Sequence, residues 1–176
     1  NYIYNDGHLG GSMNATLKDR VISLDEEFYN SDSNGNKVIW KLLNKKKRSD
    51  YEKRILRSIE WIGVSINEEL NNIAITEVAF AFESLLKHNE QSVISPSIQG
   101  QMADFVAFIC GKDIEERKML IKNFKELYSI RSAVAHGGIK KQDSEYYRYL
   151  NMFKNTLINV LIDSKFQNVK SLDALK

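Results

Sequence analysis

The chain has 176 residues, 43% of them hydrophobic, with 25 Lys and Arg against 23 Asp and Glu. The hydrophobic fraction excludes a disordered chain, the length suits one core, and a net charge of +2 does not by itself indicate a nucleic-acid partner. The only cysteine, Cys110, excludes an internal disulfide, and no apolar run reaches the roughly 18 residues of a membrane span. We therefore expect a soluble, cytoplasmic domain with no membrane partner, and a single proline favours long helices.

The first 50 residues carry the weaker patterns. Residues 1–11 are rich in glycine and suggest a loop or the tail of a preceding region, and the missing initial methionine suggests part of a longer protein. Apolar residues spaced by three and four predict a helix over 17–28, whereas residues 38–43 fit a helix or a strand. The basic run at 45–48 is expected to be a solvated linker rather than a phosphate contact, because no aromatic residues are interleaved with it.

From residue 50 onward the apolar residues recur with helical spacing. The predicted helices cover residues 55–66, 74–85, 102–109, 114–136 and 146–161. Gly111 is expected to cap the third of these helices, and Gly137 can adopt φ > 0 and end the fourth. The predicted fold class is all-α, a bundle of four to five helices over residues 51–165, with an N-terminal extension (1–50) and a C-terminal tail (166–176).

Few catalytic patterns are present. The three histidines and Cys110 lack the spacing of a metal site, and no glycine-rich phosphate loop appears, so we expect neither a metal nor a cofactor. Arg131 is the exception, because it continues the apolar stripe of its own helix, where a guanidinium needs a partner or a cleft. His136 follows five positions later, about 140° around an ideal helix, so the two side chains converge only at a turned helix end or between two copies of the chain.

A family resemblance adds to this reading. Leu127-Tyr128, Arg131-Ser132 and His136-Gly137 together resemble the Arg-x4–6-His signature of the HEPN superfamily, more narrowly of its Apea-like group. The same group has an earlier helix with Glu-x-Leu, which matches Glu83-Ser84-Leu85, and an opening helix that Arg54-Ile55 and Glu60-Trp61 approximate. The likeness covers roughly residues 54–161 and is weak or absent over the first 50.

The resemblance implies a dimeric helical bundle that cleaves RNA without a metal, as an effector domain of a bacterial anti-phage defence or toxin–antitoxin protein, with other domains or subunits of such a system as further partners. It implies that His136 is the general acid/base, that Arg131 neutralises charge on the phosphate, and that Ser132 positions it. The products are then a 2′,3′-cyclic phosphate and a 5′-hydroxyl. Imidazole is suited to such proton transfers near neutral pH.

Two further residues have alternative roles. Glu83 is expected to orient Arg131 as its counter-ion, and the alternative is that Glu83 is itself part of the active site. Tyr128 either lines the cleft or only packs against its neighbours. The competing functional hypotheses are a catalytically silent HEPN module for dimerisation or RNA binding, and a helical interaction domain whose likeness to the family is coincidental.

Overall fold

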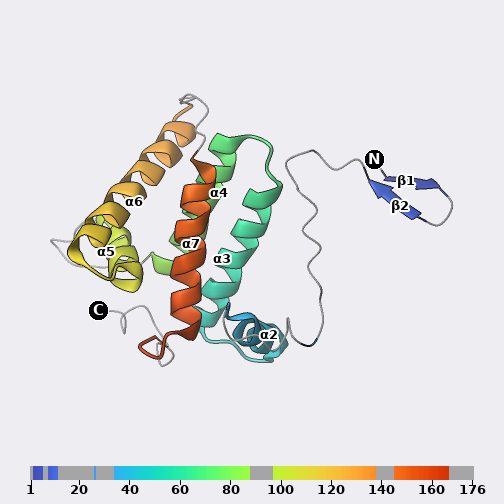
Figure 1. Ribbon diagram of the computed structural model, residues 1–176, viewed down its shortest axis with the longest axis horizontal. Coiled ribbons are helices and arrows are strands. Elements are labelled where there is room, and N and C mark those ends of the chain that lie inside the picture. The colour runs from blue at the N-terminus through green and yellow to red at the C-terminus, as the bar shows by residue number, and fades with distance from the viewer. Residues whose placement is uncertain are drawn as a thin grey trace.

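The computed structural model of the chain describes residues 2–5, 8–11, 26, 34–87, 97–137 and 145–166. Within these ranges six helices form the bundle (Figure 1): α2 (Asn36–Asn44), α3 (Asp50–Asn67), α4 (Asn71–Leu86), α5 (Ile98–Cys110), α6 (Ile114–Ala135) and α7 (Tyr146–Ile162). The five helices predicted after residue 50 correspond to α3–α7, and the helical fold class is confirmed for the bundle. None of the described helices combines the length and the apolar character that crossing a membrane requires.

The N-terminal segment differs from its prediction. Tyr2–Asn5 and His8–Gly11 are strands β1 and β2 of an antiparallel pair, in which Tyr2 lies opposite Gly11. The prediction of a loop was therefore wrong for these residues, because it followed the glycines and neglected the strand propensity of tyrosine and isoleucine. The helix predicted over 17–28 lies outside the described residues, apart from Glu26, and so does most of the break around Pro96.

The open alternative at residues 38–43 is resolved as helix α2. The basic run at 45–48 connects α2 to α3, as predicted for a linker, and two of its residues have local partners. Arg48 donates to the Leu42 and Leu43 carbonyl oxygens, and the Lys45 amine lies 2.7 Å from a Glu52 carboxylate oxygen. These contacts hold the end of α2 against the start of α3.

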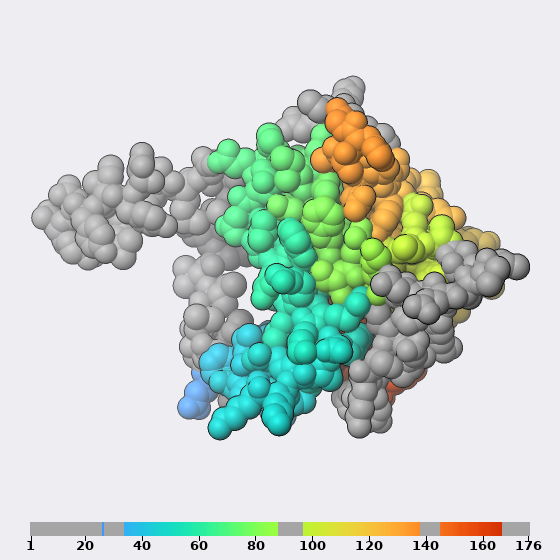
Figure 2. Space-filling model, turned by 180° about the vertical axis from the view of Figure 1, so that it is seen from behind, coloured from blue at the N-terminus to red at the C-terminus, as the bar shows by residue number. Residues whose placement is uncertain are grey.

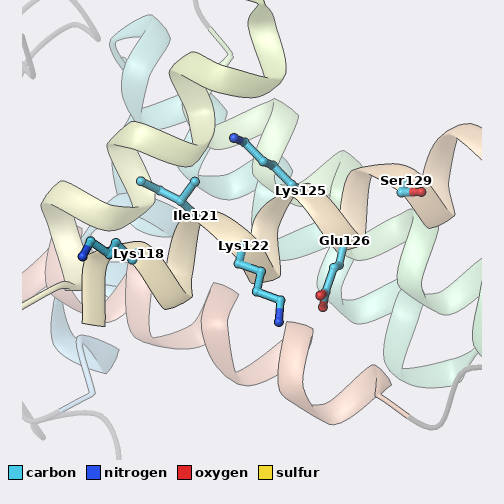
Figure 3. A pocket seen from close by; sticks show the side chains of 6 residues that line it. All are labelled: Lys118, Ile121, Lys122, Lys125, Glu126 and Ser129. Atoms are coloured by element: carbon cyan, nitrogen blue, oxygen red, sulfur yellow. The ribbon is translucent and has the colours of Figure 1, made fainter. Parts of the chain in front are cut away.

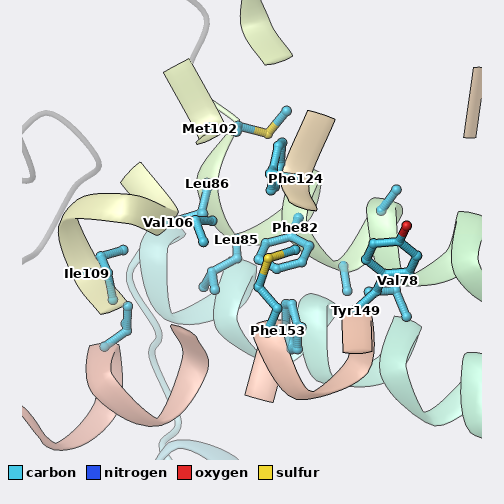
Figure 4. Close-up of a cluster of buried hydrophobic side chains, with 14 of the residues drawn as sticks. Val78, Phe82, Leu85, Leu86, Met102, Val106, Ile109, Phe124, Tyr149 and Phe153 are labelled. Carbon is cyan, nitrogen blue, oxygen red and sulfur yellow. The ribbon is translucent and has the colours of Figure 1, made fainter. Parts of the chain in front are cut away.

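Helix α4 lies at the centre of the bundle, where it contacts α3, α5, α6 and α7 (Figure 1). Ten of its 16 residues are buried because apolar side chains occupy several of its faces. Phe82 packs edge-on against both Phe124 of α6 and Phe153 of α7 (Figure 4). The core extends beyond the expected bounds of 51–165, because Leu42 and Phe166 are also buried in it.

The connection between α5 and α6 is short and crowded. Gly111 follows α5, as predicted, but its φ of −80° is not left-handed. A side chain at this position would collide with the Arg117 side chain and the Ala107 carbonyl oxygen, so lack of space explains the glycine. Asp113 then begins α6 by accepting a 2.8 Å hydrogen bond from the Glu116 backbone N–H, and the acidic first turn suits the helix dipole.

Candidate functional site

Arg131 lies where α6 crosses α4. Its Nε is 3.3 Å from Glu83 Oε1, and its guanidinium carbon lies 5.5 Å from the centre of the Phe80 ring. The Arg131 side chain is 33% exposed and that of Glu83 is 20% exposed. The predicted pairing with a carboxylate is thus present, while about a third of the Arg131 side chain stays accessible to solvent.

Tyr128, one turn before Arg131, strengthens this arrangement. Its hydroxyl donates a 2.8 Å hydrogen bond to the same Glu83 Oε1, and its ring stacks on Phe124 at a centroid distance of 5.3 Å. Burial raises the pKa of the Tyr128 phenol strongly, and its bond to the Glu83 carboxylate raises that pKa further. Tyr128 therefore remains a protonated donor, and it both packs and holds Glu83.

Phe80 is the residue of this cluster that the sequence reading missed. It lies on α4 three positions before Glu83, and therefore on the same side of that helix. Its ring also contacts Trp61 of α3, with 5.0 Å between the ring centres. An aromatic residue one turn before the expected counter-ion was the available signal. Figure 2 shows the face of the molecule on which α3, α4 and the C-terminal part of α6 adjoin.

Ser132 and His136 lie elsewhere on α6. Both residues are exposed, and the His136 backbone N–H donates a 3.1 Å hydrogen bond to the Ser132 carbonyl oxygen. Helix α6 ends at Ala135, His136 follows as its cap, and Gly137 has a φ of 75°, as its predicted role required. Ser132 and His136 are only about 40° apart around the helix, so they share a face.

The structure therefore divides the predicted site into two groups. Arg131, Glu83 and Tyr128 are in contact through one carboxylate oxygen. Ser132 and His136 form the second group, and about 140° separates the directions of Arg131 and His136 around α6. Within one copy of the chain, the arginine and the histidine thus point away from each other, as the spacing indicated.

Other reactive groups in the described residues offer no alternative centre. No group of three or more His, Cys, Asp or Glu side chains there is arranged to hold a metal ion. Cys110 is partly buried, its sulfur lies 3.3 Å from the Thr156 hydroxyl oxygen, and burial raises the pKa of its thiol. A protonated thiol is a poor nucleophile, so Cys110 has the character of a core residue.

In comparisons with known proteins, no protein family model, curated protein or solved structure matches the chain.

Proposed function

We propose that this chain is a metal-independent endoribonuclease domain of the HEPN type, acting as a homodimer in a bacterial anti-phage defence or toxin–antitoxin protein. The observation that carries the proposal is the restrained guanidinium of Arg131. It is paired with Glu83 and lies over Phe80, yet one third of the side chain remains exposed. A guanidinium fixed in this way can donate to a phosphate without further ordering, which favours stabilisation of developing charge.

The cleft of the proposed enzyme lies between two copies of the chain. Since Arg131 and His136 diverge around α6 by about 140°, a second copy is needed to bring the histidine of one α6 toward the arginine of another. The exposed position of His136 at the helix end leaves its imidazole free to meet a substrate. A twofold axis repeats each group and so concentrates positive charge in a chain whose net charge is only +2.

In the proposed reaction, His136 removes the proton from a ribose 2′-hydroxyl, and the resulting oxygen attacks the adjacent phosphorus. The bond from phosphorus to the 5′-oxygen breaks, and that oxygen takes a proton from the imidazolium or from a second His136. Arg131 stabilises the charge on the non-bridging oxygens, and Ser132 donates a hydrogen bond to one of them. The products are a 2′,3′-cyclic phosphate and a 5′-hydroxyl, and the hydrogen atoms balance without water or a metal.

The test is cleavage of end-labelled tRNA and mRNA by the purified protein in EDTA, beside His136→Ala and Arg131→Ala. We expect each substitution to lower the cleavage rate by about 10² to 10⁴, the range for losing a general acid/base or a charge-stabilising donor. Matched controls are His88→Ala and Arg57→Ala, and Arg57 is an exposed arginine of α3 paired only with Glu60 within the described residues. Both controls should cleave like the parent.

Product ends and solution mass complete the test. The 3′ product should carry a 5′-hydroxyl, and the 5′ product should resist phosphatase until its cyclic phosphate is opened by acid. The mass should be twice 20.3 kDa. Intact RNA, equal cleavage by both site variants, or a strict monomer that cleaves contradicts the proposal.

A second candidate is a catalytically silent HEPN module that dimerises or binds RNA. The separation of Arg131 from His136 within one copy favours this candidate. A single copy cannot bring the proton-transferring histidine and the charge-stabilising arginine to the same phosphate. This candidate predicts RNA binding without cleavage, and the same binding by His136→Ala.

A further inference from the structure

One side of α6 carries a continuous row of exposed polar residues. We define the lysine stripe as Lys118, Lys122 and Lys125, all of which are exposed. Steps of four and three place the stripe on one helical face, and the same steps continue through Ser129 and Ser132 to His136. All six residues lie within about 40° of a common line along α6. Arg131 lies on a different side, toward α4, and is not part of the stripe.

The stripe borders a surface groove. The described residues that line it are Ile121, Glu126, Ser129 and the three lysines (Figure 3). The groove is shallow and open to solvent, with a volume of about 450 Å³. In Figure 3 Lys122 and Lys125 extend to different sides of the α6 backbone, so their amines can meet different anionic groups.

The charge of the groove is positive after pairing. Glu126, its acidic residue, lies 2.9 Å from Arg148 Nη2 of α7, and Lys118 is paired with Glu115 at 2.8 Å. No carboxylate among the described residues forms an ion pair with Lys122 or Lys125. Two exposed amines without a carboxylate partner leave positive charge on this surface, which favours the binding of an anion.

We infer that the lysine stripe binds the phosphates of single-stranded RNA and leads the strand along α6 to His136; the inference rests on the proposed function. The stripe continues into serine hydroxyls and an imidazole, which are groups that contact phosphates. A membrane-binding helix places large apolar residues on the face that it buries, whereas the row from Lys118 to His136 consists of three lysines, two serines and a histidine. RNA therefore fits the row better than a lipid surface does.

The helix geometry predicts the size of the bound segment. From Lys118 to His136 is a rise of about 27 Å at 1.5 Å per residue. A strand that rises about 3.4 Å per nucleotide spans that distance with about eight nucleotides. Each lysine that neutralises one phosphate of a single strand adds about 0.7 to the slope of log affinity against log salt.

The test measures binding of a fluorescent RNA of about ten nucleotides to the full chain carrying His136→Ala, in EDTA, at about 0.05 to 0.2 M NaCl. Adding Lys122→Ala and Lys125→Ala should reduce the slope by about 1.4 and weaken binding about 25-fold at 0.1 M salt. The matched control removes two exposed lysines of other helices, Lys41 of α2 and Lys154 of α7, and thus the same net charge. It should change the affinity less than about threefold. Circular dichroism checks that both pairs of variants fold.

The outcomes separate this inference from the proposed function. If the Lys122/Lys125 pair and the Lys41/Lys154 pair lose RNA affinity equally, the inference about the stripe is wrong. It is also wrong if the Lys122/Lys125 variant binds RNA normally but has lost binding to anionic vesicles or to a polyglutamate peptide. With His136 intact, the Lys122/Lys125 variant should show a raised KM and an unchanged kcat. Should the wild type bind RNA through the stripe but never cleave it, the stripe stands and the ribonuclease proposal fails.

Discussion

At the scale of single residues, one carboxylate organises the candidate site. Glu83 accepts the Tyr128 hydroxyl and pairs with Arg131 through the same oxygen. The need of Arg131 for a carboxylate could be predicted from its place on an apolar stripe, and Glu83 was predicted as that carboxylate. The Phe80 ring was not predicted as a partner, because its place one turn before Glu83 is a weak signal that a core residue on the same helix would also give.

Tyr128→Phe tests this local network. The substitution keeps the ring on Phe124 and removes the hydrogen bond to Glu83 together with a long, weak one to the Met102 sulfur. We therefore expect the free energy of unfolding to fall by about 1 kcal/mol. Urea denaturation measures the change. The control is Tyr147→Phe, since Tyr147 is 64% exposed and its hydroxyl has no partner among the described residues. A Tyr128→Phe variant as stable as the control contradicts the role given to this bond.

At the scale of elements, the predictable helices were those with long apolar stripes. Helices α3 to α7 have at least 13 residues each, and their spacing identified all of them. Helix α2 has nine residues, too few for the periodicity to separate a helix from a strand. The short strands β1 and β2 were missed for a related reason, since a four-residue strand presents little alternation.

The start of α3 gives a prediction at this scale. Ser49 accepts from the Glu52 backbone N–H, and the Glu52 carboxylate accepts from the Ser49 N–H at 2.8 Å, which together form a capping box. Ser49→Ala removes one of these bonds and should lower the free energy of unfolding by about 1 kcal/mol, measured in urea. Ser84→Ala, inside α4, should show no comparable loss, because it caps no helix. Equal unfolding midpoints for Ser49→Ala and wild type argue against the cap.

At the scale of the whole molecule, α4 joins the core and the site. Its buried residues, such as Phe82, contact α6 and α7, while Phe80 and Glu83 of the same helix hold Arg131. The apolar spacing predicted that these helices pack together. It did not predict which helix is central, because that depends on how all the faces combine and not on any one of them.

Cys110 reports on the integrity of this core. Burial raises its thiol pKa, so the fold favours the protonated form. The contribution of this thiol to the free energy of unfolding is fully present below its ordinary, unfolded pKa. That contribution is lost as the pH rises through the higher pKa of the native state. At about pH 8 the native chain should therefore react with iodoacetamide more slowly than glutathione does, and labelling should increase with urea along the unfolding curve. Rapid labelling without urea contradicts this expectation, and Cys110→Ser supplies the unlabelled baseline.

The uninterrupted course of α6 from Arg131 to Ala135 has a consequence for how this chain can vary. Each residue added between Arg131 and His136 turns His136 by about 100° around the axis of α6 and advances it by about 1.5 Å. The number of intervening residues therefore changes the angle between the two side chains more than their separation along the helix. An insertion or deletion between Arg131 and His136 therefore rotates His136 around the helix axis relative to Arg131. A change of a single residue swings the imidazole to another side of the helix, whereas a change of seven nearly restores its direction.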